Sequence, residues 1–206
     1  MSDALSLAKL LKEAGFDTDE AQARAIALLV DHKLTRPGKE NIAAEKRPAV
    51  LELLASTLYR TCGHPDCRAE GGREPVRVQL AACEACGGSA NRRAALATAA
   101  VLRARGVSRV LVVGGTPTLH GELGQLFAGQ GLQFTFVDGA AGTYTAKDAA
   151  NHLRWAQVAV VWGSTPLPHK VSKLYTDDPP ASVRVIQVSR RGIEAVCQEL
   201  RKSYGG

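Results

Sequence analysis

Four short apolar runs in the second half of the chain constrain its fold more than any other feature. They read RVLVVGG from residue 109, QFTFVDG from residue 133, VAVVWGS from residue 158 and VRVIQVS from residue 183. Each run is rich in β-branched residues and ends in Gly or Ser, and helical periodicity separates the runs. Strands buried on both faces that alternate with helices are typical of a parallel sheet. The sequence therefore predicts a four-stranded parallel α/β domain over residues 89–206, opened by an Ala-rich helix that Gly106 ends.

Residues 1–60 show helical periodicity and predict a helical N-terminal segment. Gly15 ends the first helix, Asp17 with Glu20 resembles a capping box for the second, and Pro48 suits the first turn of a third. One interpretation is a helical bundle that packs on a neighbour or mediates dimerisation. The alternative is a helix-turn-helix that places basic residues on phosphates. We favour the bundle because the segment is neutral and its connector HKLTRPGKEN is long for that motif. The basic candidates for phosphate contacts here are Lys33, Arg36, Lys39, Lys46 and Arg47.

Four of the five cysteines lie in residues 61–88, at Cys62, Cys67, Cys83 and Cys86. Two short cysteine pairs that flank a small β-prone segment, which we expect to form a strand near residues 77–80, can converge on one tetrahedral ion. A disulfide framework is the rival interpretation, but the odd cysteine total and the absence of a secretion signal disfavour it. We therefore predict a zinc ribbon that holds one structural Zn²⁺. His64 lies between the two cysteines of the first pair, and the sequence leaves open whether it replaces one of the thiolates. Cys197 fits a buried position in the last helix.

The formal net charge of +6 and the pI of about 9.2 suggest an acidic partner such as nucleic acid. Residues 61–110 carry eight basic and four acidic residues, whereas residues 1–60 are neutral. Four zinc-bound thiolates would lower the formal total to +4. One possibility is that the basic side chains of this segment contact phosphates. The alternative is that the metal only stabilises the fold and that the arginines around it are solvated. The arginines concerned are Arg68, Arg73, Arg77, Arg92 and Arg93.

The loops after the four strands predict an anion or nucleotide site. In an open parallel sheet with strand order 2-1-3-4, ligands collect beyond the carboxyl ends of the strands where the order reverses. The first strand runs into a glycine-rich turn ahead of a helix, although the G-x-G-x-x-G pattern and the Walker lysine are absent. Asp138 stands where a ribose-binding acid belongs, and it also suits a simple Asp-Gly turn. The candidate anion-binding residues are Gly114, Gly115, Thr116, Asp138, Ser164, Thr165, His169, Lys170 and Arg190.

Catalysis is not expected from these residues. Ser164, His169 and Asp138 invite comparison with a hydrolytic triad, but no G-x-S-x-G elbow surrounds the serine. No stretch reaches the roughly 18 apolar residues that a membrane span requires, so we expect a cytoplasmic protein without membrane contact.

Residues 109–200 resemble an uncharacterised bacterial Rossmann-like family, number 2325 among the domains of unknown function. The matching pieces are VLVVGG, the VDG after the second run, the ST-x-x-PHK-x-x-K segment and the serine-arginine turn after the fourth run. The resemblance implies a Rossmann-like sheet and supplies no catalytic residues. The family's usual serine-histidine pair is adjacent, whereas TPLP separates Ser164 from His169 here.

The function expected from these features is non-catalytic nucleic-acid binding, with DNA preferred to RNA. By analogy, a zinc module ahead of such a domain suits a regulatory or defence-linked protein. The alternatives are a nucleotide-sensing regulator, a hydrolase that acts on nucleotides or nucleic acid, and a structural adaptor. A nucleotide or phosphate ligand and a homo-oligomer are the further partners that the sequence leaves open.

Overall fold

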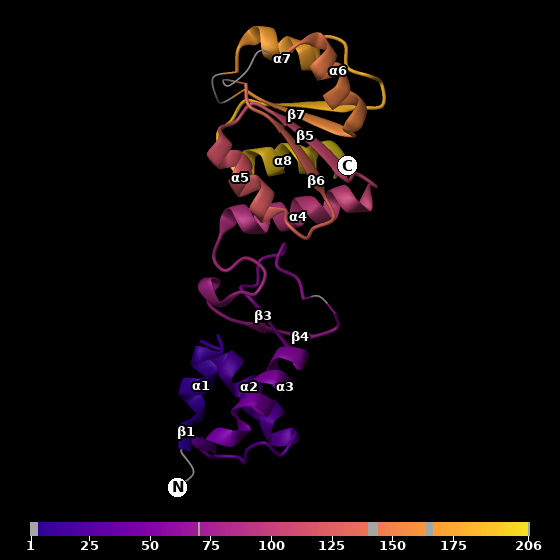
Figure 1. The fold of residues 1–206 in the computed structure, drawn as a ribbon. Helices are drawn as coiled ribbons and strands as arrows, with labels where there is room; N and C mark the ends of the chain where they lie inside the picture. Colours follow the sequence, from indigo (N-terminus) through magenta and orange to yellow (C-terminus); the bar gives the residue numbers. More distant parts are fainter. Residues whose placement is uncertain (1–3, 70, 140–143, 164–166, 206) are drawn as a thin grey trace. The chain divides into compact units, whose positions relative to one another are not determined.

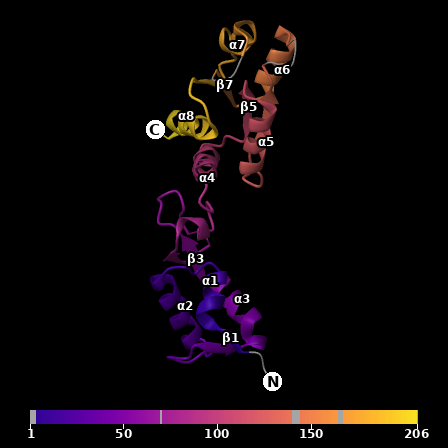
Figure 2. The same ribbon diagram turned by 90° about the vertical axis from the view of Figure 1, so that its left-hand side faces the viewer.

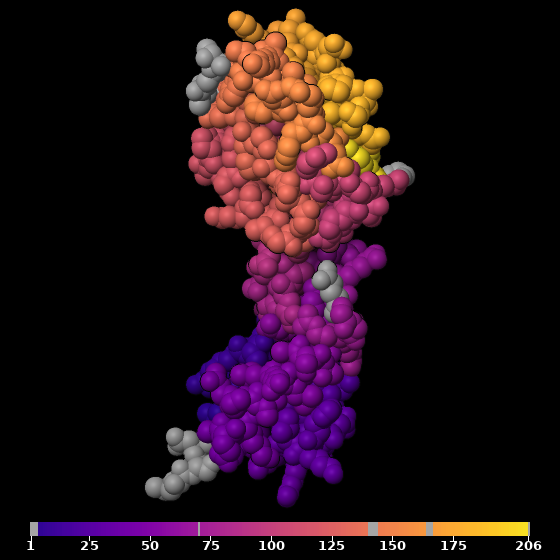
Figure 3. Space-filling view, turned by 45° about the vertical axis from the view of Figure 1, so that its right-hand side comes forward, coloured from indigo at the N-terminus to yellow at the C-terminus, as the bar shows by residue number. Residues whose placement is uncertain are grey.

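A computed structural model describes residues 4–69, 71–139, 144–163 and 167–205. The chain divides into two compact units, Met1–Arg93 and Ala94–Gly206, and each has its own apolar core (Figure 1). Figure 3 shows one face of the chain in space-filling form. The cysteine segment belongs to the first unit. The domain boundaries expected after residues 60 and 88 stay predictions.

The first unit consists of short helices and two small sheets. Its elements are β1 (Ala4–Ser6), α1 (Leu7–Glu13), α2 (Asp19–Asp31), β2 (Asn41–Ala43), the 3₁₀ turn η1 (Ala44–Lys46), α3 (Arg47–Thr57), β3 (Leu58–Thr61), β4 (Glu74–Arg77) and the 3₁₀ turn η2 (Leu80–Ala82). The three helices pack side by side (Figure 2) because their apolar residues recur at helical spacing and bury one common face. Gly15, with φ of +87°, follows α1, and Pro48 lies in the first turn of α3, as the sequence predicts.

Both small sheets of the first unit join segments that are distant in sequence. β1 pairs with β2 in antiparallel register, and β3 pairs with β4 in parallel register. The strand expected near residues 77–80 is therefore displaced to Glu74–Arg77, and Leu80 instead opens η2. The displacement has a tertiary cause, because the backbone N–H of Gln79 donates to the carboxylate of the distant residue Asp17 at 2.9 Å rather than to a neighbouring strand.

The N-terminal cap of α2 also differs from the expectation. Thr18, not Asp17, caps the helix, and its Oγ1 accepts from the backbone N–H of Ala21 at 3.2 Å. The Thr18 hydroxyl also donates to the Arg77 carbonyl at 2.7 Å. The Asp17 carboxylate is therefore not needed for the cap and accepts from the Gln79 N–H instead. These bonds attach the segment that precedes Cys83 to the start of α2, and Val76 and Val78 are buried in the core of the helices.

The second unit contains a four-stranded, fully parallel sheet in the order β6-β5-β7-β8. Numbered from the first of these strands, this is the order 2-1-3-4 that the sequence predicts. The elements are α4 (Ala90–Ala104), which begins in the first unit, β5 (Arg109–Val113), α5 (Pro117–Leu126), β6 (Gln133–Val137), α6 (Ala146–Trp155), β7 (Val158–Trp162), α7 (His169–Thr176), β8 (Arg184–Val188) and α8 (Ile193–Tyr204).

Helices cover both faces of this sheet (Figure 1). The core on one face combines α4, α5 and α8 with strand residues such as Val110 and Val160, and the core on the other combines α6 and α7 with Leu111 and Val161. Alternate strand residues thus point to opposite faces, and each finds an apolar layer. Cys197 of α8 is fully buried, as predicted, and burial raises the pKa of its thiol to about 11.

Candidate metal centre and anion-binding loops

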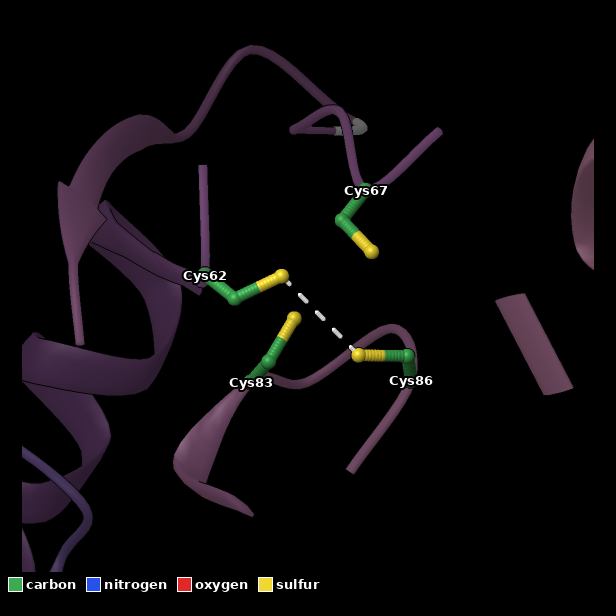
Figure 4. A group of neighbouring side chains, drawn as sticks. All are labelled: Cys62, Cys67, Cys83 and Cys86. Carbon is green, nitrogen blue, oxygen red and sulfur yellow. Dashed lines mark hydrogen bonds between the residues drawn. The ribbon is translucent and has the colours of Figure 1, made fainter. Parts of the chain in front are cut away.

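The four cysteines of the first unit converge on one point (Figure 4). Cys62 directly follows β3, and Cys67 lies five residues later, after a turn in which its backbone N–H donates to the His64 carbonyl at 2.8 Å. Cys83 ends η2, and a second turn brings Cys86 back toward it, closed by a bond from the Gly87 N–H to the Cys83 carbonyl at 2.8 Å. Because β3 and the segment before Cys83 are neighbours, the two turns face each other.

The sulfur atoms have the spacing of a four-thiolate metal site. All four Sγ atoms lie within 4.8 Å of one another, and those of Cys62 and Cys86 are 4.0 Å apart. A tetrahedron with metal–sulfur bonds of about 2.3 Å has sulfur–sulfur edges of about 3.8 Å. A disulfide requires about 2.05 Å, and all five cysteines are free thiols. These residues can therefore hold one metal ion, with four protein ligands and no open position for substrate.

Burial and backbone hydrogen bonds set the protonation of these thiols. Cys67, Cys83 and Cys86 are nearly inaccessible to solvent, whereas Cys62 is half-buried. Burial raises the pKa of Cys67 and of Cys86 above the ordinary thiol value. Burial also tends to raise the pKa of Cys83. Hydrogen bonds from the backbone N–H groups of Cys86 and Cys62 outweigh burial there and lower the Cys83 pKa to about 7. A bound cation favours the thiolate form of each ligand, so metal binding releases protons here.

His64 lies beside this cluster but is not part of it. Its side chain is 41% exposed, and its Nδ1 accepts from the backbone N–H of Asp66 at 3.2 Å. That bond occupies the ring nitrogen nearest to the backbone. The ligand set that the described residues bring together is the cysteine quartet without His64.

Glu84, which sequence reasoning missed, attaches the second cysteine turn to the helical core. Its Oε1 accepts from both the backbone N–H and the Nε of Arg60 at 3.2 Å, and its Oε2 accepts from Nη1 of Arg73 at 2.9 Å. The two guanidinium groups also donate to the carbonyls of Ala14 and Ala55 at the ends of α1 and α3. Burial raises the pKa of Glu84, but these bonds outweigh it and hold the pKa below its ordinary value.

The arginines around the cysteines fall into two groups. Arg73 is occupied inside the fold by Glu84 and by the ring of Tyr59, 4.9 Å from its guanidinium carbon. Arg68, Arg77 and Arg92 are exposed, and in the described part of the chain no carboxylate lies within ion-pair distance of them. The Arg77 guanidinium lies against Gly63 in the first cysteine turn, and Arg68 donates to the Pro65 carbonyl of the same turn.

The remaining basic candidates of the first unit, except Arg93, lie at exposed positions. The segment between α2 and α3 contains β2 and is far longer than the turn of a helix-turn-helix. Lys46 donates to the Leu34 carbonyl at 3.2 Å. The exposed basic residues on or beside this segment are Lys33, Arg36, Lys39, Lys46 and Arg47, and Arg93 is half-buried on α4.

The glycine-rich turn after β5 is packed by side chains of its own unit. Gly114 and Gly115 have φ of +93° and +90°, and His120 Nε2 lies 2.8 Å from the Gly114 carbonyl oxygen. A Cβ on Gly115 would lie 3.0 Å from His120 and 3.1 Å from Trp162, so close packing explains the glycine. Thr116 caps α5 by accepting from Leu119, and Pro117 has no N–H to offer. Fewer backbone donors therefore point outward than the sequence suggests.

The other predicted anion-binding residues within the described ranges follow the carboxyl ends of β6, β7 and β8. Asp138 follows β6, and His169 and Lys170 are exposed at the start of α7. The Arg190 side chain turns toward α8, where its Nη2 lies 3.4 Å from the Glu199 carboxylate, while its carbonyl accepts from the Trp162 indole at 3.0 Å. Ser164 and Thr165 lie outside the described residues. The proposed crevice remains a prediction.

Among the helices of the described ranges, none combines the length and the apolar character needed to cross a bilayer. Comparison of the chain with protein-family models, with curated proteins and with solved structures found no match.

Proposed function

We propose that this chain is a zinc-containing nucleic-acid-binding protein in which the metal has a structural role. The observation that supports the metal is the quartet of Cys62, Cys67, Cys83 and Cys86, whose sulfur atoms lie within 4.8 Å of one another. Four thiolates at tetrahedral spacing suit Zn²⁺, and a site closed by four protein ligands stabilises a fold rather than activating water. Zn²⁺ would fix both cysteine turns at the end of the first unit.

The exposed arginines support the nucleic-acid part of this proposal. Arg68 and Arg77 contact the first cysteine turn, and Arg92 lies six residues after Cys86. Their guanidinium groups are available to phosphate oxygens, which they bind in a bidentate manner. Contacts of this kind give affinity without sequence readout, and each neutralised phosphate releases counterions. We propose DNA as the preferred polymer, and comparison of duplex and single-stranded DNA and RNA tests that choice.

Neutralising the three exposed arginines tests the interface. We expect the triple variant Arg68→Gln, Arg77→Gln, Arg92→Gln to lose duplex affinity by more than about tenfold and to reduce the slope of log affinity against log salt by roughly two to three. Fluorescence anisotropy with generic duplexes at several salt concentrations measures both. Zinc content by mass spectrometry verifies that the variant keeps its metal.

A variant with the same loss of charge elsewhere provides the control. The triple variant Lys147→Gln, Arg154→Gln, Lys173→Gln removes three exposed cations from α6 and α7 of the second unit. It should keep its affinity, because a localised interface depends on the position of the charges and not on their total. Equal losses in the two triple variants, or no binding to any polymer at low salt, would contradict the proposed interface.

A further inference from the structure

The strand β6 forms one edge of the four-stranded sheet. The order β6-β5-β7-β8 leaves it paired with β5 alone in the part of the chain that the structure describes. The N–H of Gln133 and the carbonyl of Val137 form main-chain bonds of 2.7 and 2.9 Å on the β5 side. Because these groups alternate in direction along a strand, those of Phe134 and Phe136 point to the open side. Within the described ranges, no other residue bonds to these outward groups.

β6 has none of the features that usually protect an edge strand from pairing. Such strands often contain a charged residue or a proline, or a bulge interrupts their regular pairing. The sequence QFTFV contains neither charge nor proline, and its pairing with β5 is regular over the whole strand. Its three central residues are partly exposed, whereas β5 is almost fully buried. β8, the opposite edge, begins with Arg184 and exposes Gln187.

The aromatic rings of β6 belong to a stacked row that gives the edge an ordered apolar surface. The ring centroids of Phe127 and Phe134 are 4.8 Å apart, those of Phe134 and Phe136 are 5.8 Å apart, and those of Phe136 and His120 are 4.7 Å apart. The His120 ring is fixed in turn by its contact with the Gly114 carbonyl oxygen at 2.8 Å. Because neighbours restrain these rings, a partner that packs against them causes little further loss of side-chain entropy.

The sequence of β6 complements a second copy of itself in antiparallel orientation. Thr135 is its middle residue and has a phenylalanine on either side. If Thr135 lies on a two-fold axis, Phe134 of each copy faces Phe136 of the other. These are the residues whose main-chain groups point outward, so each such pair can exchange both of its N–H···O bonds, and the two threonines form the pair without hydrogen bonds between them. Aromatic pairs across neighbouring strands add to the stability of the contact.

We propose that β6 pairs with β6 of a second copy of this chain, in antiparallel register about Thr135, and joins the two sheets into one. A two-fold contact uses the same surface on both copies and closes at the dimer, whereas pairing of β6 with β8 of the next copy would extend without end. An uncharged strand suits this contact because each chain carries a formal charge of +6 and like charges at an interface repel. The proposal does not rest on nucleic-acid binding, since β6 belongs to the second unit.

Sedimentation equilibrium of the full chain tests the dimer. We expect a mass of twice the 21.8 kDa of one chain. Thr135→Lys and Thr135→Glu should each raise the dissociation constant of the dimer by at least about tenfold, because two like charges then face each other across the axis. An equimolar mixture of these two variants should restore the dimer, because lysine then faces glutamate. Gln187→Lys, which places the same charge on the opposite edge, is the matched control and should leave the dimer intact.

Hydrogen exchange of the unmodified chain provides a second measurement that needs no variant. The amides of Phe134 and Phe136 should exchange more slowly as the protein concentration rises, because they are bonded only in the dimer. The amide of Thr135 points to β5 and should be protected at every concentration, so it is the internal reference. Tryptophan emission from the buried Trp162 verifies that each variant in the sedimentation experiment is folded.

Several results would overturn the proposal. One is a monomer at submillimolar concentration, and another is a dimer that Thr135→Lys does not weaken. Failure of the mixed variants to associate would rule out the register about Thr135, and an equal loss in Gln187→Lys would mean that total charge governs the association. A monomer whose Phe134 and Phe136 amides are protected would assign the edge to another segment of the same chain.

Discussion

At the scale of single residues, Glu84 links the cysteine quartet to the helices. It lies between Cys83 and Cys86, its side chain is 21% exposed, and it receives hydrogen bonds from two arginines. These arginines reach the carbonyls at the ends of α1 and α3. One carboxylate thus connects the second cysteine turn to two helices, and losing it leaves two guanidinium groups without their anion.

We expect Glu84→Gln to lower the stability of the first unit by about 1 to 3 kcal/mol, because partly buried cations that lose their carboxylate retain their desolvation cost. Chemical denaturation followed by far-ultraviolet circular dichroism measures the change. Glu52→Gln, at an exposed position on α3, should have little effect. Zinc content should be the same in both variants because the ligands are intact. An unchanged denaturation midpoint in Glu84→Gln would show that the ion pairs contribute nothing.

The four cysteines that could hold a metal ion were predicted from the sequence, whereas Glu84 could not be. Short spacing between paired cysteines is a local pattern, and it identified all four residues that the fold brings together. The partners of Glu84 lie 24 and 11 residues earlier in the chain. They become neighbours only because β3 and β4 pair in parallel, which no local pattern encodes. The same long-range pairing decides that Arg73 is internal while Arg77 is exposed.

At the scale of elements, α6 has a capping box whose strength depends on pH. Thr145 Oγ1 accepts from the backbone N–H of Asp148 at 3.2 Å, and the Asp148 carboxylate accepts from the Thr145 N–H at 2.9 Å and from its hydroxyl at 2.7 Å. The hydrogen bonds from Thr145 hold the pKa of Asp148 below its ordinary value. The ionised carboxylate also interacts favourably with the positive end of the helix.

We expect Asp148→Asn to lower the free energy of unfolding at pH 7 and to have no effect at acidic pH. Because the folded pKa is depressed, the stabilisation is complete above the unfolded pKa, about 3.9, and is lost as the pH falls through the folded pKa. Urea denaturation followed by tryptophan emission at several pH values measures the difference. Asp178→Asn, an exposed change in the loop before β8, is the control. A difference that persists at low pH would rule out the charge as its cause.

The repetitive elements were predictable, and the short ones were not. Each apolar run is a strand, and the pattern is strongest in the central strands β5 and β7, which are apolar because they are buried along almost their whole length. The strands β1, β2 and β3 have three or four residues each, so too few positions exist for a period to emerge. The cap of α2 moved from Asp17 to Thr18 because Gln79, distant in sequence, takes up the aspartate. Tertiary contacts, not local preference, decided these positions.

At the scale of the whole molecule, the two units have separate apolar cores and separate spectroscopic signals. The core of α1, α2 and α3 includes Val76 and Val78 from the cysteine segment, whereas the described residues in the two cores of the sheet all belong to the second unit. Both tryptophans of the chain, Trp155 and Trp162, belong to the second unit. Tryptophan emission therefore reports on the sheet alone, and circular dichroism reports on both units.

Removal of the proposed metal ion should consequently destabilise the first unit and leave the second unit intact. Without an ion, the four thiols share a buried site and no bonds join the two cysteine turns. The strands β3 and β4 then become less stable, together with the packing of Val76 and Val78 in the helical core. We expect a zinc chelator to reduce the helical dichroism and to lower the denaturation midpoint of the first unit, with no change in tryptophan emission or in its midpoint. Cys83→Ser should reproduce this result without chelator. Cys197→Ser, which alters a buried thiol of the second unit, should instead retain zinc and lower the midpoint that tryptophan emission reports. A chelator effect on tryptophan emission would show that the two cores unfold as one.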